Sequence, residues 1–73
     1  MRAKQRGSYC QRFVHAGKEH VANVREYVTF WEGEIDASNR FKVYKDERRR
    51  VVTSGILAWV FVHRHFMKVY TKK

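Results

Sequence analysis

The stretch that decides the fold is EYVTFWEGEIDASNRFKVYK, residues 26–45. Two runs rich in aromatic and β-branched side chains flank the tetrapeptide DASN. Such runs, separated by Asp, Ser and Asn, are typical of a β-hairpin. Within each run the side chains alternate between two faces, as they do along a strand. We therefore predict a hairpin here, with Gly33 as a candidate position for a β-bulge.

The chain before this hairpin is predicted to contain a short strand and a short helix. Tyr9–Val14 is the strand, and Ala16-Gly17 is the break that ends it. The segment 18–25 is ambiguous, because its valines follow helical spacing while their β-branched side chains favour a strand. We expect a short helix over this segment.

The chain after the hairpin continues with a polar connector over residues 46–50. Val51 and Val52 then precede a Thr-Ser-Gly break and the apolar stretch ILAWVFVHRH, residues 56–65. The β-branched and aromatic content of this stretch favours a strand of about six to eight residues. A short helix is the alternative, because one helical face would hold Leu57, Val60, Phe61 and Arg64.

Together these elements predict a small α+β fold: an antiparallel β-sheet with one short helix and flexible basic ends. A chain of 73 residues is enough for one domain. We expect a flexible basic arm over 1–8, a single small domain over 9–62 and a basic tail over 63–73. A sheet this small leaves exposed edges, which invite pairing with other chains.

The charge of the chain is strongly basic, with 16 Lys and Arg against 7 Asp and Glu and a net charge of +9. The charge is uneven along the chain. Residues 1–20 and 48–73 are basic, and residues 21–47 between them are mildly acidic. Such a distribution predicts attraction to polyanions or to acidic protein surfaces.

The residue types that carry chemistry are sparse, and we expect no catalysis, no cofactor and no metal. Cys10 is the only cysteine, which excludes an internal disulfide and favours a reducing compartment. We expect it to be buried. His63 and His65 lack the paired ligand spacing of a zinc site, so we interpret them as surface histidines. The acidic residues of the middle segment are interpreted as the solvent face of the sheet; they are Glu26, Glu32, Glu34 and Asp36.

Basic residues alternate with aromatic ones in three segments, a pattern that suits phosphate contacts and base stacking as well as protein interfaces. The three sets are Arg6, Tyr9, Arg12 and Phe13; Phe41, Lys42, Tyr44 and Lys45; and Arg64, Phe66, Lys68 and Tyr70. The chain also opens with MRAKQRGSYCQRF, residues 1–13, and closes with FMKVYTKK, residues 66–73. In size and character, and in these two ends, it resembles the small RNA-polymerase-binding transcription regulators of lytic phages that infect Xanthomonas.

The resemblance implies a protein of the host bacterial cytoplasm that binds the β and β′ subunits of RNA polymerase near the RNA exit channel. It implies that the protein blocks initiation by displacing the σ factor and suppresses termination. We expect a monomer with nucleic acid nearby and no membrane partner. The alternative is a small basic protein that binds DNA or RNA directly. A third hypothesis is that the protein is a membrane-surface peptide with an amphipathic helix over 56–70.

The residues that we expect to make these contacts follow from charge and ring content alone. The expected partner-binding residues are Arg2, Lys4, Arg6, Tyr9, Arg12 and Phe13. The residues expected to face nucleic acid or an acidic surface are Arg48, Arg49, Arg50, Arg64 and Lys68.

Overall fold

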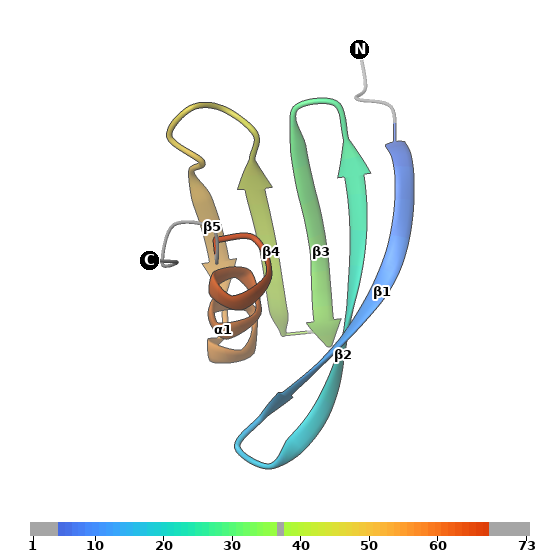
Figure 1. Ribbon diagram of the computed structural model, residues 1–73, viewed down its shortest axis with the longest axis vertical. Coiled ribbons are helices and arrows are strands. Elements are labelled where there is room, and N and C mark those ends of the chain that lie inside the picture. Colours follow the sequence, from blue (N-terminus) through green and yellow to red (C-terminus); the bar gives the residue numbers. More distant parts are fainter. Residues whose placement is uncertain (1–4, 37, 68–73) are drawn as a thin grey trace.

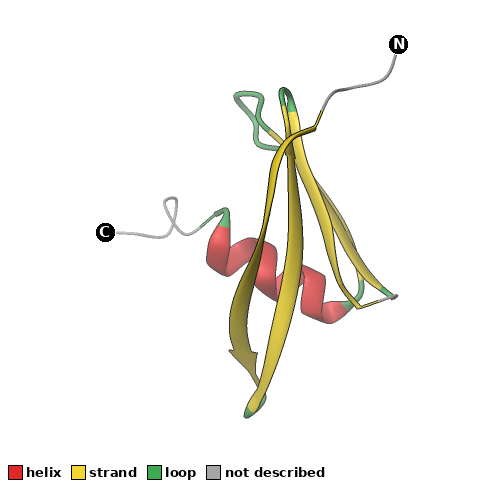
Figure 2. Ribbon diagram, turned by 90° about the vertical axis from the view of Figure 1, so that its right-hand side faces the viewer, coloured by secondary structure: helices red, strands yellow, loops and turns green. Residues whose placement is uncertain are grey.

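The computed structural model describes residues 5–36 and 38–67. Five strands form one antiparallel sheet in which each strand pairs with its neighbour in the sequence, and a helix packs on one face of it (Figure 1, Figure 2). This arrangement confirms the predicted α+β class. The elements are β1 (Gln5–His15), β2 (Lys18–Tyr27), β3 (Phe30–Asp36), β4 (Asn39–Tyr44), β5 (Val51–Ser54) and α1 (Ile56–His65).

The predicted hairpin is the β3–β4 pair. Its register places Gly33 opposite Phe41 and Trp31 opposite Val43. Gly33 marks no bulge, because the irregularity in the register lies between Glu34 and Asp36. Gly33 is instead required for close packing, since a Cβ at this position would lie 1.9 Å from the carbonyl oxygen of Asn23.

The segment 18–25 is part of strand β2, so the predicted helix is wrong here. A tight turn at Ala16-Gly17 returns the chain antiparallel to β1, and pairing then runs from His15 opposite Lys18 to Gln5 opposite Tyr27. Both turn residues have positive φ. This non-local pairing selects the strand, because the valine spacing of the segment alone fits either structure.

The stretch 56–65 forms helix α1, so the favoured strand is wrong and the helical alternative is confirmed. Strand β5 continues through Thr53 and Ser54, and the break comes at Gly55, whose φ is 94°. The sheet still has an apolar face to cover at this point, and a helix covers it with residues spaced three and four apart. Ala58, Phe61 and Val62 are buried in this way.

The two ends of the domain lie outside the predicted limits. Strand β1 begins at Gln5, so residues 5–8 belong to the sheet and not to an arm. Helix α1 extends through His65, and Phe66 after it is buried. The rest of the predicted arm, 1–4, and of the predicted tail, 68–73, lies outside the described residues.

The core lies between the sheet and α1. Its rings pack around Phe61, whose centroid is 5.3 Å from those of Phe13 and Phe41 and 5.9 Å from that of Phe66. Such tilted aromatic pairs add to the stabilisation that burial of apolar area provides. The buried cluster comprises Ala22, Val24, Phe41, Val43, Ala58, Phe61, Val62 and Phe66.

The β1–β2 hairpin is longer than the sheet that it joins. Strand β2 pairs with β3 only over Asn23–Glu26, so the distal half of the hairpin has β1–β2 pairing alone (Figure 1). Helix α1 supports this distal half, because Phe13 packs on Phe61 and the Arg64 guanidinium donates to the carbonyl oxygen of Val14. Within residues 5–36 and 38–67, no helix is long and apolar enough to cross a membrane.

Candidate binding surfaces

The two faces of the sheet have different surroundings. Helix α1 covers one face, and no helix or strand of the described chain covers the other (Figure 2). We call this second surface the open face. Because successive side chains of a strand point to opposite faces, the neighbours of buried Val24, Gly33 and Val43 belong to it.

Three aromatic rings cross the open face on neighbouring strands. Tyr27 of β2 stacks on Phe30 of β3 with centroids 4.6 Å apart and planes at 18°. Phe30 lies 6.3 Å from Tyr44 of β4, which is opposite it in the register. All three side chains are only partly buried. We call these three residues the ring ladder.

Two cations lie on the rings of the ladder. The Lys42 ammonium is 4.3 Å from the centroid of Phe30 and 5.1 Å from that of Tyr44. The Arg50 guanidinium is 4.7 Å from the centroid of Tyr44 and also pairs with Asp46 at 2.8 Å. Aromatic rings and positive charge are therefore combined on one surface.

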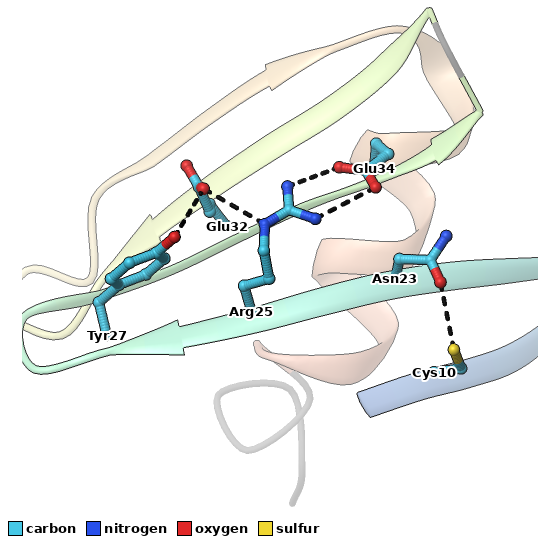
Figure 3. A network of polar contacts seen from close by, with 6 residues as sticks. All are labelled: Cys10, Asn23, Arg25, Tyr27, Glu32 and Glu34. Carbon is cyan, nitrogen blue, oxygen red and sulfur yellow. Dashed lines mark hydrogen bonds and ion pairs between the residues drawn. The ribbon is translucent and has the colours of Figure 1, made fainter. Parts of the chain in front are cut away.

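A polar network lies beside the ladder on the same face (Figure 3). Arg25 donates to both oxygens of Glu34, at 2.6 and 3.2 Å, and approaches Glu32 at 3.4 Å. The hydrogen bonds from Arg25 hold the pKa of Glu34 below its ordinary value. Tyr27 donates its hydroxyl to Glu32 at 3.3 Å, which links this network to the ladder.

A hollow of about 440 Å³ lies at the end of the ladder, between the β2–β3 turn and the β4–β5 loop. The backbone bond from Lys45 N–H to the carbonyl oxygen of Thr29, at 3.0 Å, joins the two segments there. Its lining combines apolar, hydroxyl and charged groups. It is formed by Val28, Thr29, Tyr44, Lys45, Asp46 and Arg50.

The outer edge of β1 is a second candidate surface. No strand in the described part of the chain pairs with this edge, which is 11 residues long. The other edge strand, β5, has 4 residues. A long edge of this kind can pair with a strand of another protein. Arg6, Tyr9 and Arg12 are exposed along it.

Some of the expected partner-binding residues are exposed on the surface, and one packs in the core. Arg6 and Arg12 are exposed on β1, and Arg12 lies 3.8 Å from Glu19. Tyr9 is 40% exposed, and its hydroxyl lies 2.7 Å from His65 Nε2. Burial, with a contribution from Glu26, raises the pKa of this hydroxyl. Phe13 packs in the core against Phe61, and Arg2 and Lys4 lie outside the described residues.

The residues expected to face nucleic acid do not form one patch. In the β4–β5 loop, Arg50 lies over Tyr44 of the ladder, whereas Arg49 lies 6.0 Å from the ring of Trp31, whose side chain packs on the helix side. Arg48 is exposed. Arg64 supports the β1–β2 hairpin as described above, and Lys68 lies outside the described residues.

Sequence reasoning missed the ring ladder as a unit. It identified Lys42 and Tyr44 in one basic-aromatic segment but did not connect them with Tyr27 and Phe30. The alternation of the predicted hairpin puts Lys42 and Tyr44 on one face of its second strand. The register that places Phe30 opposite Tyr44, and the pairing of β2 with β3, come only from the structure. Cys10 was also wrongly expected to be buried, since it is exposed on β1 with its thiol 3.1 Å from Asn23 Oδ1.

The described ranges contain no group of three or more His, Cys, Asp or Glu side chains that could hold a metal ion. No family model matches the chain, and neither a curated protein nor a solved structure does. The resemblance to phage transcription regulators thus stays a prediction from the sequence.

Proposed function

We propose that this protein is a non-catalytic regulator of transcription that binds bacterial RNA polymerase in the host cytoplasm. It blocks initiation by displacing the σ factor and suppresses termination, as the resemblance of the sequence implies. Displacement of σ needs only a difference in affinity between polymerase states and no chemical step. The small size of the chain and its net charge of +9 agree with a binding role.

The structural observation that supports this proposal best is the outer edge of β1, with which no strand of residues 5–36 and 38–67 pairs. Its backbone groups can add to a sheet of a large partner, and its exposed side chains can contact acidic residues beside that sheet. Arg6 and Arg12 supply the positive charge, and Tyr9 supplies an exposed ring of the kind that dominates protein interfaces.

The test is gel filtration of the full chain with bacterial core polymerase and with the σ-containing holoenzyme. We expect the protein to co-elute with the core enzyme and to release σ from the holoenzyme. Arg12→Glu is expected to weaken the complex, because it places a like charge against an acidic partner surface. Arg40→Glu carries the same charge change on β4, three strands away, and serves as the matched control.

Failure of the unmodified chain to bind the core enzyme at moderate salt would show that the proposal is wrong. Equal weakening by the two substitutions would exclude β1 as the docking element, because diffuse charge would then account for binding.

A further inference from the structure

We propose that the open face binds single-stranded nucleic acid, with unpaired bases stacked on the ring ladder of Tyr27, Phe30 and Tyr44 and phosphates held by Lys42 and Arg50. The site goes beyond polymerase binding and does not depend on it. It is carried by the geometry of five side chains from β2, β3, β4 and the β4–β5 loop.

The rings form a platform of the right kind for bases. Tyr27 and Phe30 stack on each other with centroids 4.6 Å apart, and Tyr44 lies 6.3 Å from Phe30. The faces left for bases are therefore the outer face of Tyr27 and the faces of Phe30 and Tyr44 over which Lys42 lies. A base stacked on an aromatic side chain contributes about 1–3 kcal/mol, whatever the base. Stacking of this type needs unpaired bases, so the ladder selects single strands over duplexes.

The cations on the ladder can move from ring to phosphate. Lys42 covers the faces of Phe30 and Tyr44 in the unbound protein. Such a partly exposed cation–π contact is worth only about 0.5–1 kcal/mol. The gain from a stacked base therefore exceeds the loss, and the long lysine side chain remains close enough to neutralise a phosphate.

The acidic groups nearby are already neutralised in part. Glu32 and Glu34 lie beside the ladder, but both approach the Arg25 guanidinium, which is shared between them. Asp46 is paired with Arg50. Arg40, on the same face and close enough to lower the pKa of Glu34, adds positive charge at the far side of this network.

The hollow at the end of the ladder continues the same surface. Tyr44 and Arg50 belong both to the ladder region and to the lining of this 440 Å³ space. Thr29 brings a hydroxyl to the same space, a group that binds phosphate and base edges, whereas the Lys45 ammonium pairs with Glu26 at 2.6 Å over the Trp31 ring. A strand that crosses the rings would place its next nucleotide here.

A nucleic acid fits this face better than a protein partner does. Protein interfaces also use aromatic residues and Arg, but their centres are depleted of Lys. Here Lys42 lies at the centre of the ladder, between two rings. The interleaving of rings with cations matches the sheet platforms on which RNA-binding proteins stack two or three bases.

The experiment measures fluorescence anisotropy of labelled single strands of about 12 nucleotides, oligouridine RNA and oligothymidine DNA, with the full chain and no polymerase. The double variant Phe30→Leu/Tyr44→Leu removes two rings and leaves the net charge unchanged. We expect it to weaken binding of the single strands by roughly tenfold or more. Trp59→Leu, which removes a ring that is 50% exposed on α1, is the matched control and should bind like the unmodified protein.

A second variant, Lys42→Gln, tests the phosphate contact. The slope of log K against log salt should become shallower by about 0.7, the value for one phosphate contact on a single strand. Circular dichroism of each variant verifies that the fold is retained. Tight binding of single-stranded RNA or DNA, with these losses, supports the site.

Three results would overturn the proposal: no binding of single strands at about 0.15 M salt, equal affinity for duplex and single strand, or equal affinity of the leucine double variant and the Trp59 control. Loss of polymerase binding by the double variant without any oligonucleotide binding would assign the face to protein instead. Because the assay contains no polymerase, a lack of oligonucleotide binding would not contradict the proposed polymerase binding. A lack of polymerase binding would likewise not contradict the proposed nucleic-acid site.

Discussion

Asn39, the first residue of β4, accepts the backbone N–H of Leu57 through its side-chain oxygen at 3.2 Å. Leu57 lies in the first turn of α1, where backbone N–H groups have no partner within the helix. Gly55, before the helix, offers no side-chain cap of its own. The sheet therefore supplies the cap that fixes where the helix begins.

Removal of this cap should destabilise the protein. We expect Asn39→Ala to lower the free energy of unfolding by about 1 kcal/mol, within the range for lost helix caps. Asn39 also donates to Asp36 at 2.7 Å, so its loss loosens the turn as well. Urea denaturation followed by circular dichroism measures the change. Ser38→Ala in the adjoining turn is the control, and an equal effect of the two substitutions would show that the cap has no special role.

Gly33 is expected to tolerate no side chain. Its Cβ would lie 1.9 Å from the backbone of Asn23 and 2.7 Å from the Phe41 ring, so Gly33→Ala must displace β2 or β4. We expect a loss of about 3 kcal/mol or more in the free energy of unfolding. Gly7→Ala is the matched control, because nothing lies within 4 Å of the corresponding Cβ. Thermal unfolding of the two variants measures the difference. Equal midpoints would contradict this packing.

The helical state of residues 56–65 can be tested with two aromatic residues. A strand would place Trp59 and Phe61 on the same face, whereas α1 buries Phe61 to 1% exposure and leaves Trp59 50% exposed. We expect Phe61→Ala to reduce the free energy of unfolding by about 3–5 kcal/mol and Trp59→Ala to have a small effect. Phe61→Leu gives a folded variant for comparison if the alanine variant does not fold. Similar losses for Trp59→Ala and Phe61→Ala would speak against the helix.

The Arg25–Glu34 pair predicts a loss of stability in acid. Arg25 lowers the pKa of Glu34 from its ordinary value of 4.5 in the folded protein. The stabilisation is therefore complete above pH 4.5 and is lost as the pH falls through the folded pKa. In Glu34→Gln, the thermal midpoint should fall less steeply between about pH 5 and pH 3 than in the unmodified protein. The pKa values of Asp36, Glu26 and Asp46 are lowered too, so the variant retains part of the decline. Parallel declines in the two proteins would exclude a contribution from Glu34.

The sequence correctly predicts an element when its structure depends on residues that are close together in the chain. The β3–β4 hairpin was correctly predicted because its alternation and its Asp-Ser-Asn turn lie within one short stretch. The segments 18–25 and 56–65 were assigned to the wrong elements, although the count of one helix was right. In both, the local pattern fits helix and strand, and the choice depends on pairing with β1 and on the apolar face left by the finished sheet.

The candidate surfaces show the same contrast between local sequence patterns, which can be seen in the sequence, and contacts between strands, which cannot. Charge and ring content placed Arg6 and Arg12 among the expected contact residues, and both are exposed on β1. The ring ladder depends on Tyr27 and Tyr44 meeting through Phe30, and that contact exists only when three strands are in register. The structural roles of Phe13 and Arg64 also depend on contacts with residues about 50 positions away in the chain.

Helix α1 is the last element in the order of the described chain, and this affects how the protein folds during its synthesis on the ribosome. The helix region is synthesised after all five strands, yet it supplies half of the buried cluster. Until it emerges, Val24, Phe41 and Val43 have no cover, and a nascent sheet with a bare apolar side is prone to aggregate. Translation that stops early, before Phe61 and Phe66, would therefore yield a product for degradation rather than a smaller working protein.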